Sequence, residues 1–139
     1  MLREKITGEV RVSKVEVKSL AEFAKKIESS LTASATELLG IILGGAVSLD
    51  ASDIHTEPEE EKSKLRIRID GILHDVLFLE PKIYKTLLSR IKLLSGIKLN
   101  ITDRPQDGRY TILFEKNIIE IRASTLPAEY GEAIVLRIL

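Results

Sequence analysis

The spacing of the apolar residues changes along the chain, and this change most constrains the fold. Between Leu20 and Val47 apolar residues recur at helical spacing, whereas from Asp50 onward they alternate with polar residues. The first pattern predicts amphipathic helices and the second predicts half-buried strands. Helices that precede and interrupt a run of strands indicate an α+β fold with a mostly antiparallel sheet, and not a parallel nucleotide-binding sheet.

Capping signals place the helices. Ser19 with Glu22, and Ser34 with Glu37, have the spacing of a capping box, in which a serine and a glutamate satisfy the first free backbone N–H groups. Gly96 is placed to end a third helix that starts at a proline. We therefore expect helices over residues 20–31, 34–47 and 81–95.

Turn residues divide the second part of the chain into strands. Asp70-Gly71 predicts a two-residue hairpin turn, and Glu115-Lys116-Asn117 predicts a second turn. Residues 126–131 are expected to connect to the last strand. The strands are expected at residues 10–17 (short or bulged), around 54, and at 65–69, 72–79, 109–114, 118–125 and 132–139.

Two glycine patterns in the second helix resemble functional motifs but lack their other parts. Gly40 and Gly45 have the separation of phosphate-loop glycines, but Ala46-Val47 follow where Lys and Ser or Thr are required. Gly40 and Gly44 match the small-residue pattern of membrane helix pairs, but the uncharged stretch has only 12 residues, and a membrane span needs about 20. We expect a core helix packed closely against a sheet.

The charges balance in total but are sorted along the chain. The 21 Lys+Arg equal the 21 Asp+Glu, which argues against a general binder of nucleic acids or anionic membranes. The absence of cysteine excludes disulfides, thiolate nucleophiles and Cys-based zinc sites. Seven of the nine arginines follow residue 60, directly after an acidic run, Glu57–Glu61, that we interpret as a solvated loop.

One polar strand face has two interpretations. Asp53, His55 and Glu57 alternate and so lie on one face of a strand, where they could bind a metal or form an acid–base pair. The alternative is a polar face with one hydrogen-bonded histidine, and it is favoured because three ligands on a flat strand converge poorly. His74 is isolated beside Asp75. No nucleophile signature is present, so the sequence does not support catalysis by this chain alone.

Two arginines interrupt apolar strands. Arg122 follows Ile121, and Arg137 lies between Leu136 and Ile138. An arginine there is costly unless it reaches a surface, a carboxylate or a phosphate, and its planar guanidinium suits two-pronged phosphate binding. The alternative is an exposed face with Glu120 and Glu132 as ion-pair partners. From the residues alone, the exposed face is the favoured interpretation.

A resemblance to a known family rests on an ordered set of motifs: Ala51-Ser52-Asp53-Ile54-His55, Arg68-Ile69-Asp70-Gly71, Ser89-Arg90-Ile91-Lys92, Pro105-Gln106-Asp107-Gly108-Arg109, Ile121-Arg122-Ala123-Ser124-Thr125-Leu126-Pro127, Tyr130-Gly131-Glu132 and Val135-Leu136-Arg137-Ile138-Leu139. Over about residues 34–139, the chain resembles the domain that precedes the phosphate-loop domain in bacterial type II secretion and type IV pilus assembly ATPases. Thr56 replaces the usual Ile, and the shortened segment 101–105 leaves Arg104 without an assigned role.

The resemblance implies a PAS-like α+β domain at residues 34–139, with residues 1–33 as an N-terminal appendage or linker. The parent would be a cytoplasmic hexameric ATPase, peripheral to the inner membrane, that uses ATP with Mg²⁺. Its implied partners are its own C-terminal ATPase domain, neighbouring subunits of the homohexamer and the inner-membrane pilus or secretion platform, with no nucleic acid and no membrane insertion. Arg122 and Arg137 would approach the ATP phosphates in the full-length ring, and Arg109, in the signature turn, is a third candidate.

Two further expectations concern the chain by itself. Its last residues, 134–139, are almost all apolar, which we expect of a fragment of a longer protein. Such a fragment would bind no cofactor tightly and have no ATPase activity, because the phosphate loop is absent. The alternative function is a PAS-like module that binds a small ligand or a protein partner, although its aliphatic faces and six aromatic residues leave little interior space. Pilus assembly, secretion and competence are not separated.

Overall fold

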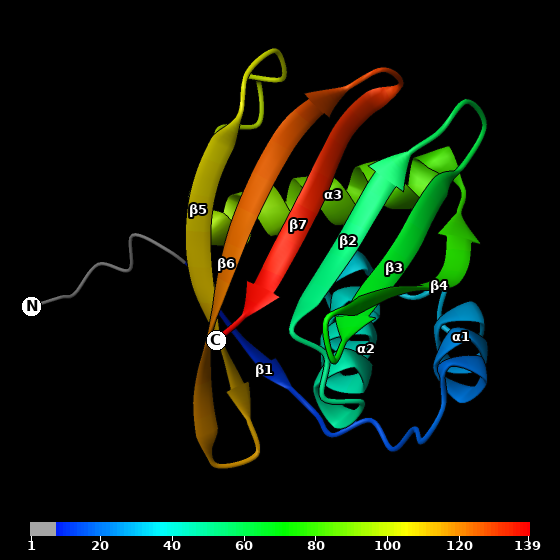
Figure 1. Ribbon diagram of the computed structural model, residues 1–139. Coiled ribbons are helices and arrows are strands. Elements are labelled where there is room, and N and C mark those ends of the chain that lie inside the picture. The colour runs from blue at the N-terminus through cyan, green and yellow to red at the C-terminus, as the bar shows by residue number, and fades with distance from the viewer. Residues whose placement is uncertain (1–7) are drawn as a thin grey trace, which may run out of the picture.

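One sheet with helices on a single face forms the structure (Figure 1). The computed structural model describes residues 8–139. The helices are α1 (Leu20–Glu28), α2 (Ala35–Ser48) and α3 (Pro81–Ser95). The strands are β1 (Glu9–Val12), β2 (Asp53–Pro58), β3 (Ser63–Ile69), β4 (Ile72–Leu79), β5 (Gln106–Phe114), β6 (Asn117–Ala128) and β7 (Gly131–Ile138). The predicted α+β class is confirmed.

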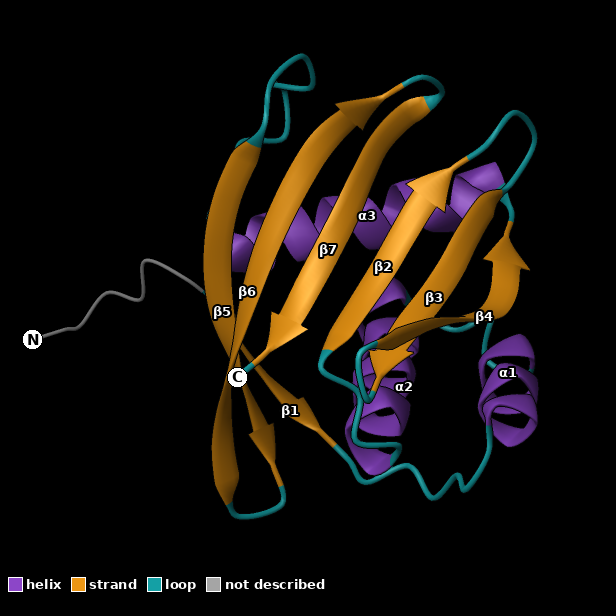
Figure 2. Ribbon diagram, viewed as in Figure 1, coloured by secondary structure: helices purple, strands orange, loops and turns teal. Residues whose placement is uncertain are grey.

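The sheet consists of two antiparallel meanders joined side by side. Its strand order is β1-β5-β6-β7-β2-β3-β4, so β7 lies between β6 and β2 (Figure 2). Each meander follows chain order, and the antiparallel pairing of β2 with β7 connects them. The short edge strand β1 is the exception to the antiparallel pattern, because it pairs with β5 in parallel.

The predicted caps start and end the helices. The Oγ atom of Ser19 accepts a hydrogen bond from the Glu22 N–H, and that of Ser34 accepts one from Glu37, both at 3.1 Å. Gly96 ends α3 in the left-handed conformation, with φ of 76°, which glycine adopts without a steric penalty. Helix α1 ends at Glu28, sooner than the apolar spacing predicts.

Three strands differ from the prediction by three residues or more: β5 begins at Gln106, ahead of the predicted start at Arg109, and the other two are β1 and β6. Strand β1 is limited to Glu9–Val12, while Val15 and Val17 are buried in an extended segment outside the sheet. Strand β6 continues to Ala128, so the expected six-residue connection to β7 contracts to a tight turn at residues 129 and 130. Hydrogen bonding between β6 and β7 therefore extends through the predicted connection.

The core lies between the sheet and the helices. Phe23 and Ile27 of α1 are fully buried with the strand side chains Ile67, Tyr110 and Ile121. Residues that precede position 34 therefore pack in the same core as the later ones. Among residues 8–139, no helix has the length and the apolar character that crossing a membrane requires.

The glycines of α2 allow close packing. A Cβ atom added to Gly45 would lie 2.2 Å from the Phe23 ring, and one added to Gly44 would lie 2.7 Å from the carbonyl oxygen of Ser13. The expectation of a closely packed core helix is confirmed, but the closest approach is to α1 and the segment before it rather than to the middle of the sheet.

Candidate functional site

The candidate site is a row of charged side chains that crosses five strands. Register pairing places Arg109 opposite Arg122, Arg122 opposite Arg137, Arg137 opposite Asp53, and Asp53 opposite Arg68. Residues directly opposite each other project from the same face of a sheet. We call this set the arginine row; in order across β5, β6, β7, β2 and β3 it consists of Arg109, Arg122, Arg137, Asp53 and Arg68.

The arginine row lies on the face of the sheet that the helices leave uncovered. The chain neighbours Ile121, Leu136 and Ile67 point into the core and are at most 1% exposed. Side chains alternate between the two faces of a strand, so the row points the opposite way. That face is turned toward the viewer in Figure 1, with α2 and α3 behind the sheet. The row is therefore accessible to a ligand or to another protein domain.

Like charges lie next to each other on the β5, β6 and β7 side of the row. The side chains of Arg109, Arg122 and Arg137 are 68%, 65% and 63% exposed. Glu120 is the carboxylate between the first two, with Oε2 at 3.8 Å from Arg109 Nη1 and 3.5 Å from Arg122 Nε. Like charges opposite each other destabilise a sheet. This arrangement adds nothing to the stability of the core and is better suited to an anionic ligand.

Asp53 is the buried member of the row. Its side chain is only 8% exposed, and its Oδ2 lies 3.5 Å from both Arg68 Nε and His55 Nε2. Its Oδ1 lies 3.8 Å from Arg137 Nε. A buried carboxylate needs charged or hydrogen-bonding partners. Here two arginines and a histidine lie within 4 Å of it, and the contact with Arg137 is the longest of the three.

Two adjoining hollows lie along the row. One, of about 340 Å³, is lined by Arg122, Ser124 and Arg137, and the other, of about 650 Å³, by Asp53, Arg68 and Arg137. Arg137 belongs to both hollows, and Arg109 belongs to neither. Guanidinium groups that converge on an open hollow are suited to binding phosphate oxygens.

The structure brings the first two predicted site residues together. Arg122 and Arg137 are direct cross-strand neighbours, and Arg109 lies opposite Arg122 on β5. The alternative partners differ: Glu120 contacts Arg122, whereas Glu132 is buried and pairs with Lys92 at 2.5 Å. The predicted alternative, an exposed face on which both glutamates pair with arginines, therefore holds for Glu120 but not for Glu132.

In the described residues, the Asp53, His55 and Glu57 cluster does not form a metal site, and Arg104 does not belong to the arginine row. Within residues 8–139, no group of three His, Asp or Glu side chains is placed to hold a metal ion. His55 is turned toward Asp53, and Glu57 lies farther along β2 as an exposed side chain. Arg104 pairs with its neighbour Asp103 at 3.2 Å, away from the row.

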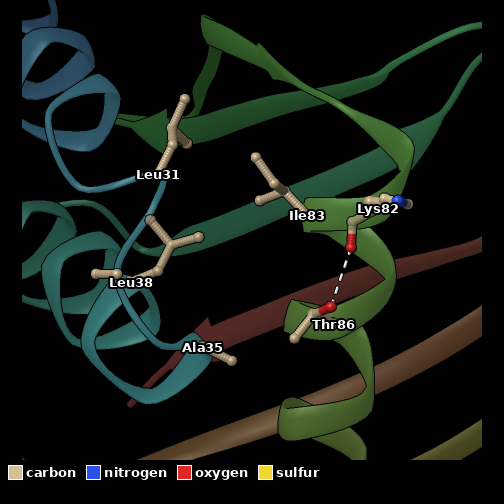
Figure 3. A pocket seen from close by; sticks show the side chains of 7 residues that line it. Leu31, Ala35, Leu38, Lys82, Ile83 and Thr86 are labelled. Atoms are coloured by element: carbon tan, nitrogen blue, oxygen red, sulfur yellow. Dashed lines mark hydrogen bonds between the residues drawn. The ribbon is translucent and has the colours of Figure 1, made fainter.

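A third hollow lies on the helical side of the molecule and has a different character. Its volume is about 190 Å³. Figure 3 shows apolar side chains from α2 and the segment before it facing α3. The Thr86 hydroxyl donates to the Lys82 carbonyl oxygen at 3.0 Å. Its lining includes the apolar residues Leu31, Ala35, Leu38 and Ile83, and also Lys82 and Thr86 of α3.

Comparison with known proteins identifies the family. The family described as "Type II/IV secretion system protein" matches residues 28–139, most of the chain. The chain belongs to this family. The resemblance predicted from the ordered motifs is thereby confirmed.

Members of the secretion family from several bacteria are similar to this chain. The Type II secretion system ATPase E of Vibrio cholerae is 37% identical over 115 residues, which cover 81% of this chain and 22% of that protein. The Type IV pilus assembly ATPase PilB of Myxococcus xanthus is 33% identical over 135 residues, covering 96% of this chain and 23% of that protein. The chain thus spans less than a quarter of the length of these relatives.

Sequence reasoning missed two members of the arginine row in this secretion-family chain. The sequence indicates Asp53 as a metal ligand, as half of an acid–base pair or as part of a polar face and of the Ala51–His55 motif, and Arg68 only as part of a motif. Arg66 and Arg68 alternate with apolar residues in β3, which marks them as exposed-face positions. That signal shows which face they share, but it does not show which strand lies beside them, so the placement of Arg68 opposite Asp53, and of Asp53 opposite Arg137, was not predictable.

Proposed function

We propose that this chain is the nucleotide-sensing and subunit-assembly domain of a hexameric ATPase that powers type IV pilus assembly or type II secretion. Membership of the secretion family supports the parent activity, because the similar proteins are named as ATPases of these systems. The observation that carries the sensing role is the direct pairing of Arg122 with Arg137 at an open hollow.

In the proposed mechanism, the arginines respond to the phosphates of a nucleotide held elsewhere in the parent protein. The Arg122 and Arg137 guanidinium groups are mostly exposed, and their ion pairs at 3.5 and 3.8 Å are long. The pair of Arg122 with the partly exposed Glu120 contributes little stability, so exchanging this carboxylate for a phosphate costs little. Positive charge brought to the polyphosphate stabilises the charge that develops there during hydrolysis. Arg109, outside the hollows, would contact only the edge of such a ligand.

The same contact would link the nucleotide state to the shape of the ring. A domain that approaches the nucleotide when the phosphates are present and withdraws when they are lost moves as a rigid body. The proposed partners are the C-terminal ATPase domain, which binds ATP with Mg²⁺, the neighbouring subunits and the inner-membrane platform. The proposed location is the cytoplasmic side of that membrane. Residues 34–139 would form the PAS-like domain, with residues 8–33 packed on its core.

The test is ATP turnover by the full-length parent carrying Arg122→Ala or Arg137→Ala. We expect each variant to lose at least about tenfold in turnover, the range typical of a lost charge contact in a transition state. Arg104→Ala is the matched control, because the Arg104 side chain is similarly exposed at 67% and, among the described residues, forms an ion pair only with Asp103. Turnover unchanged in both site variants would refute the sensing role. The 139-residue chain alone is expected to bind ATP weakly and to hydrolyse none.

The second hypothesis, a PAS-like module for a small ligand, has less support. Such a module needs space between the sheet and the helices, but that region is filled by large, fully buried side chains that include Phe23, Ile27, Leu43, Ile67 and Tyr110. The hollows of the arginine row lie on the other face of the sheet.

A further inference from the structure

Asp53 is the one negative member of the row and lies between Arg137 and Arg68. From β5 to β3 the charges of the row run positive, positive, positive, negative, positive. The Asp53 side chain is 8% exposed, whereas that of Arg137 beside it is 63% exposed. The carboxylate is thus a fixed anion, and the neighbouring arginine has room to move.

The two carboxylate oxygens of Asp53 have different partners. Oδ2 faces Arg68 and His55, each at 3.5 Å, and these neighbours lie on β3 and on β2 itself. Oδ1 faces only Arg137 among the ion pairs of the described residues, at 3.8 Å, which is too long for a hydrogen bond. Asp53 would therefore keep its partners on Oδ2 if Arg137 moved to another anion.

The geometry points to Asp53 as an internal competitor for phosphate. This inference rests on the proposed function of Arg122 and Arg137. Without nucleotide, Asp53 holds Arg137 against the sheet; with nucleotide, Arg137 transfers to a phosphate oxygen, while Arg68 stays with Asp53 and offsets its charge. Asp53 thereby weakens the affinity of the row for phosphate and keeps the contact reversible.

The same charge order limits where a polyphosphate lies. A chain of phosphates that extended past Arg137 toward β2 would meet the Asp53 carboxylate. Phosphates that extend from Arg137 toward Arg122 and Arg109 meet no carboxylate of the row itself, although two carboxylates outside the row lie beside them: Glu120 contacts both arginines, and Asp107 lines the smaller hollow. The charge order therefore favours a polyanion on the β6 side of Arg137, and Arg68, which lines only the larger hollow, acts on it mainly through Asp53.

The experiment titrates inorganic tripolyphosphate into the 139-residue chain and follows the arginine Nε–Hε signals by NMR. Asp53→Asn is expected to bind about tenfold more tightly, the order of magnitude for removing a unit charge several ångströms from an anion at a protein surface. Asp75→Asn is the matched control for net charge, because Asp75 pairs with Arg66 on the neighbouring strands and contacts no member of the row. The control is expected to bind within twofold of the unchanged chain.

A charge-balanced variant separates competition from net charge and also guards against misfolding. Asp53→Asn combined with Arg68→Gln leaves the net charge of the chain unchanged and removes the competitor. We expect binding several times tighter than in the unchanged chain, with a larger shift of the Arg137 Nε signal. Equal or weaker binding by this double variant would overturn the inference.

The arginine variants separate the competitor role of Asp53 from the existence of the phosphate site itself. If Arg122→Ala and Arg137→Ala weaken tripolyphosphate binding but the Asp53 variants do not strengthen it, the competitor role is wrong and the phosphate site remains. If neither arginine variant weakens binding, the phosphate site itself is wrong, whatever the Asp53 variants do.

Discussion

The buried ion pair between Lys92 and Glu132 makes a quantitative prediction about stability. The Lys92 Nζ atom lies 2.5 Å from Glu132 Oε1, and the side chains are only 3% and 7% exposed. The lysine comes from α3 and the glutamate from the start of β7. Within residues 8–139, the second glutamate oxygen, Oε2, is buried without a hydrogen-bond partner. Lys92 is therefore the main group that offsets this buried negative charge.

Lys92→Met is expected to lower the free energy of unfolding by about 3–5 kcal/mol. Methionine replaces most of the apolar stem, so the loss comes mainly from leaving Glu132 charged and unpaired in the interior. The double variant Lys92→Met/Glu132→Met removes both charges and is expected to recover most of the loss, because apolar replacement of a whole buried pair is often neutral or stabilising. The backbone carbonyl of Glu132 keeps its hydrogen bond from the Tyr84 hydroxyl in both variants.

Urea denaturation followed by circular dichroism measures these differences. For a chain of this size, the single variant should also melt about 10–20 °C lower. Lys85→Met is the control, since Lys85 is exposed on the same helix and its replacement should change stability by less than about 0.5 kcal/mol. A loss below about 1 kcal/mol for Lys92→Met, or a double variant no more stable than the single one, would refute the reasoning.

Two further predictions follow from packing and burial. Gly108→Ala should destabilise the protein by about 1–3 kcal/mol or more, because the new Cβ would lie 2.2 Å from the carbonyl oxygen of Ser95. Gly40→Ala should instead stabilise α2 by about 0.5–1 kcal/mol, because a Cβ there has no neighbouring atom within 4 Å. Urea denaturation midpoints compare the two variants, and equal midpoints would contradict the packing argument. Burial raises the pKa of Tyr110, and burial followed by the charge of Glu132 raises that of Tyr84. Because the unfolded state then loses these protons first, stability should be complete below pH about 10 and fall as the pH rises above it. Tyr84→Phe should reduce that slope in urea titrations between pH 9 and 11, and an unchanged slope for both tyrosine-to-phenylalanine variants would contradict the assignment.

Local signals were sufficient for the helices and the turns. The Ser19 and Ser34 caps, the Gly96 stop and the Asp70-Gly71 turn each depend on residues within four positions of one another. The free energy of such a motif is local, so the sequence around it decides the structure. The alternating strand pattern likewise identified which side chains face the core.

Long-range pairing was beyond local reasoning. The position of Lys92 was predicted only as helix, and its burial depends on Glu132 being brought to the same place by β7. Similarly, Arg137 is next to Asp53 only because β2 pairs with β7. A strand pattern predicts a face but not a neighbour, because many pairings bury the same apolar side chains. The family resemblance identified Arg122 and Arg137 as candidates for phosphate binding, whereas only the strand register of the structure placed Asp53 and Arg68 in the same row.

The pairing of β2 with β7 has a consequence for folding. Arg122 and Arg137 belong to one hairpin, whereas Asp53 and Arg137 are separated by more than half of the chain. Closing the longer loop costs more conformational entropy and must precede the contacts that reward it. Each meander can therefore form from contacts nearby in the sequence before the boundary between them closes. Arg109, Arg122 and Arg137 are therefore aligned when the β5–β7 meander forms. Asp53 comes to lie beside Arg137 only when β2 pairs with β7, so the row has both its positive and its negative members only in the complete sheet.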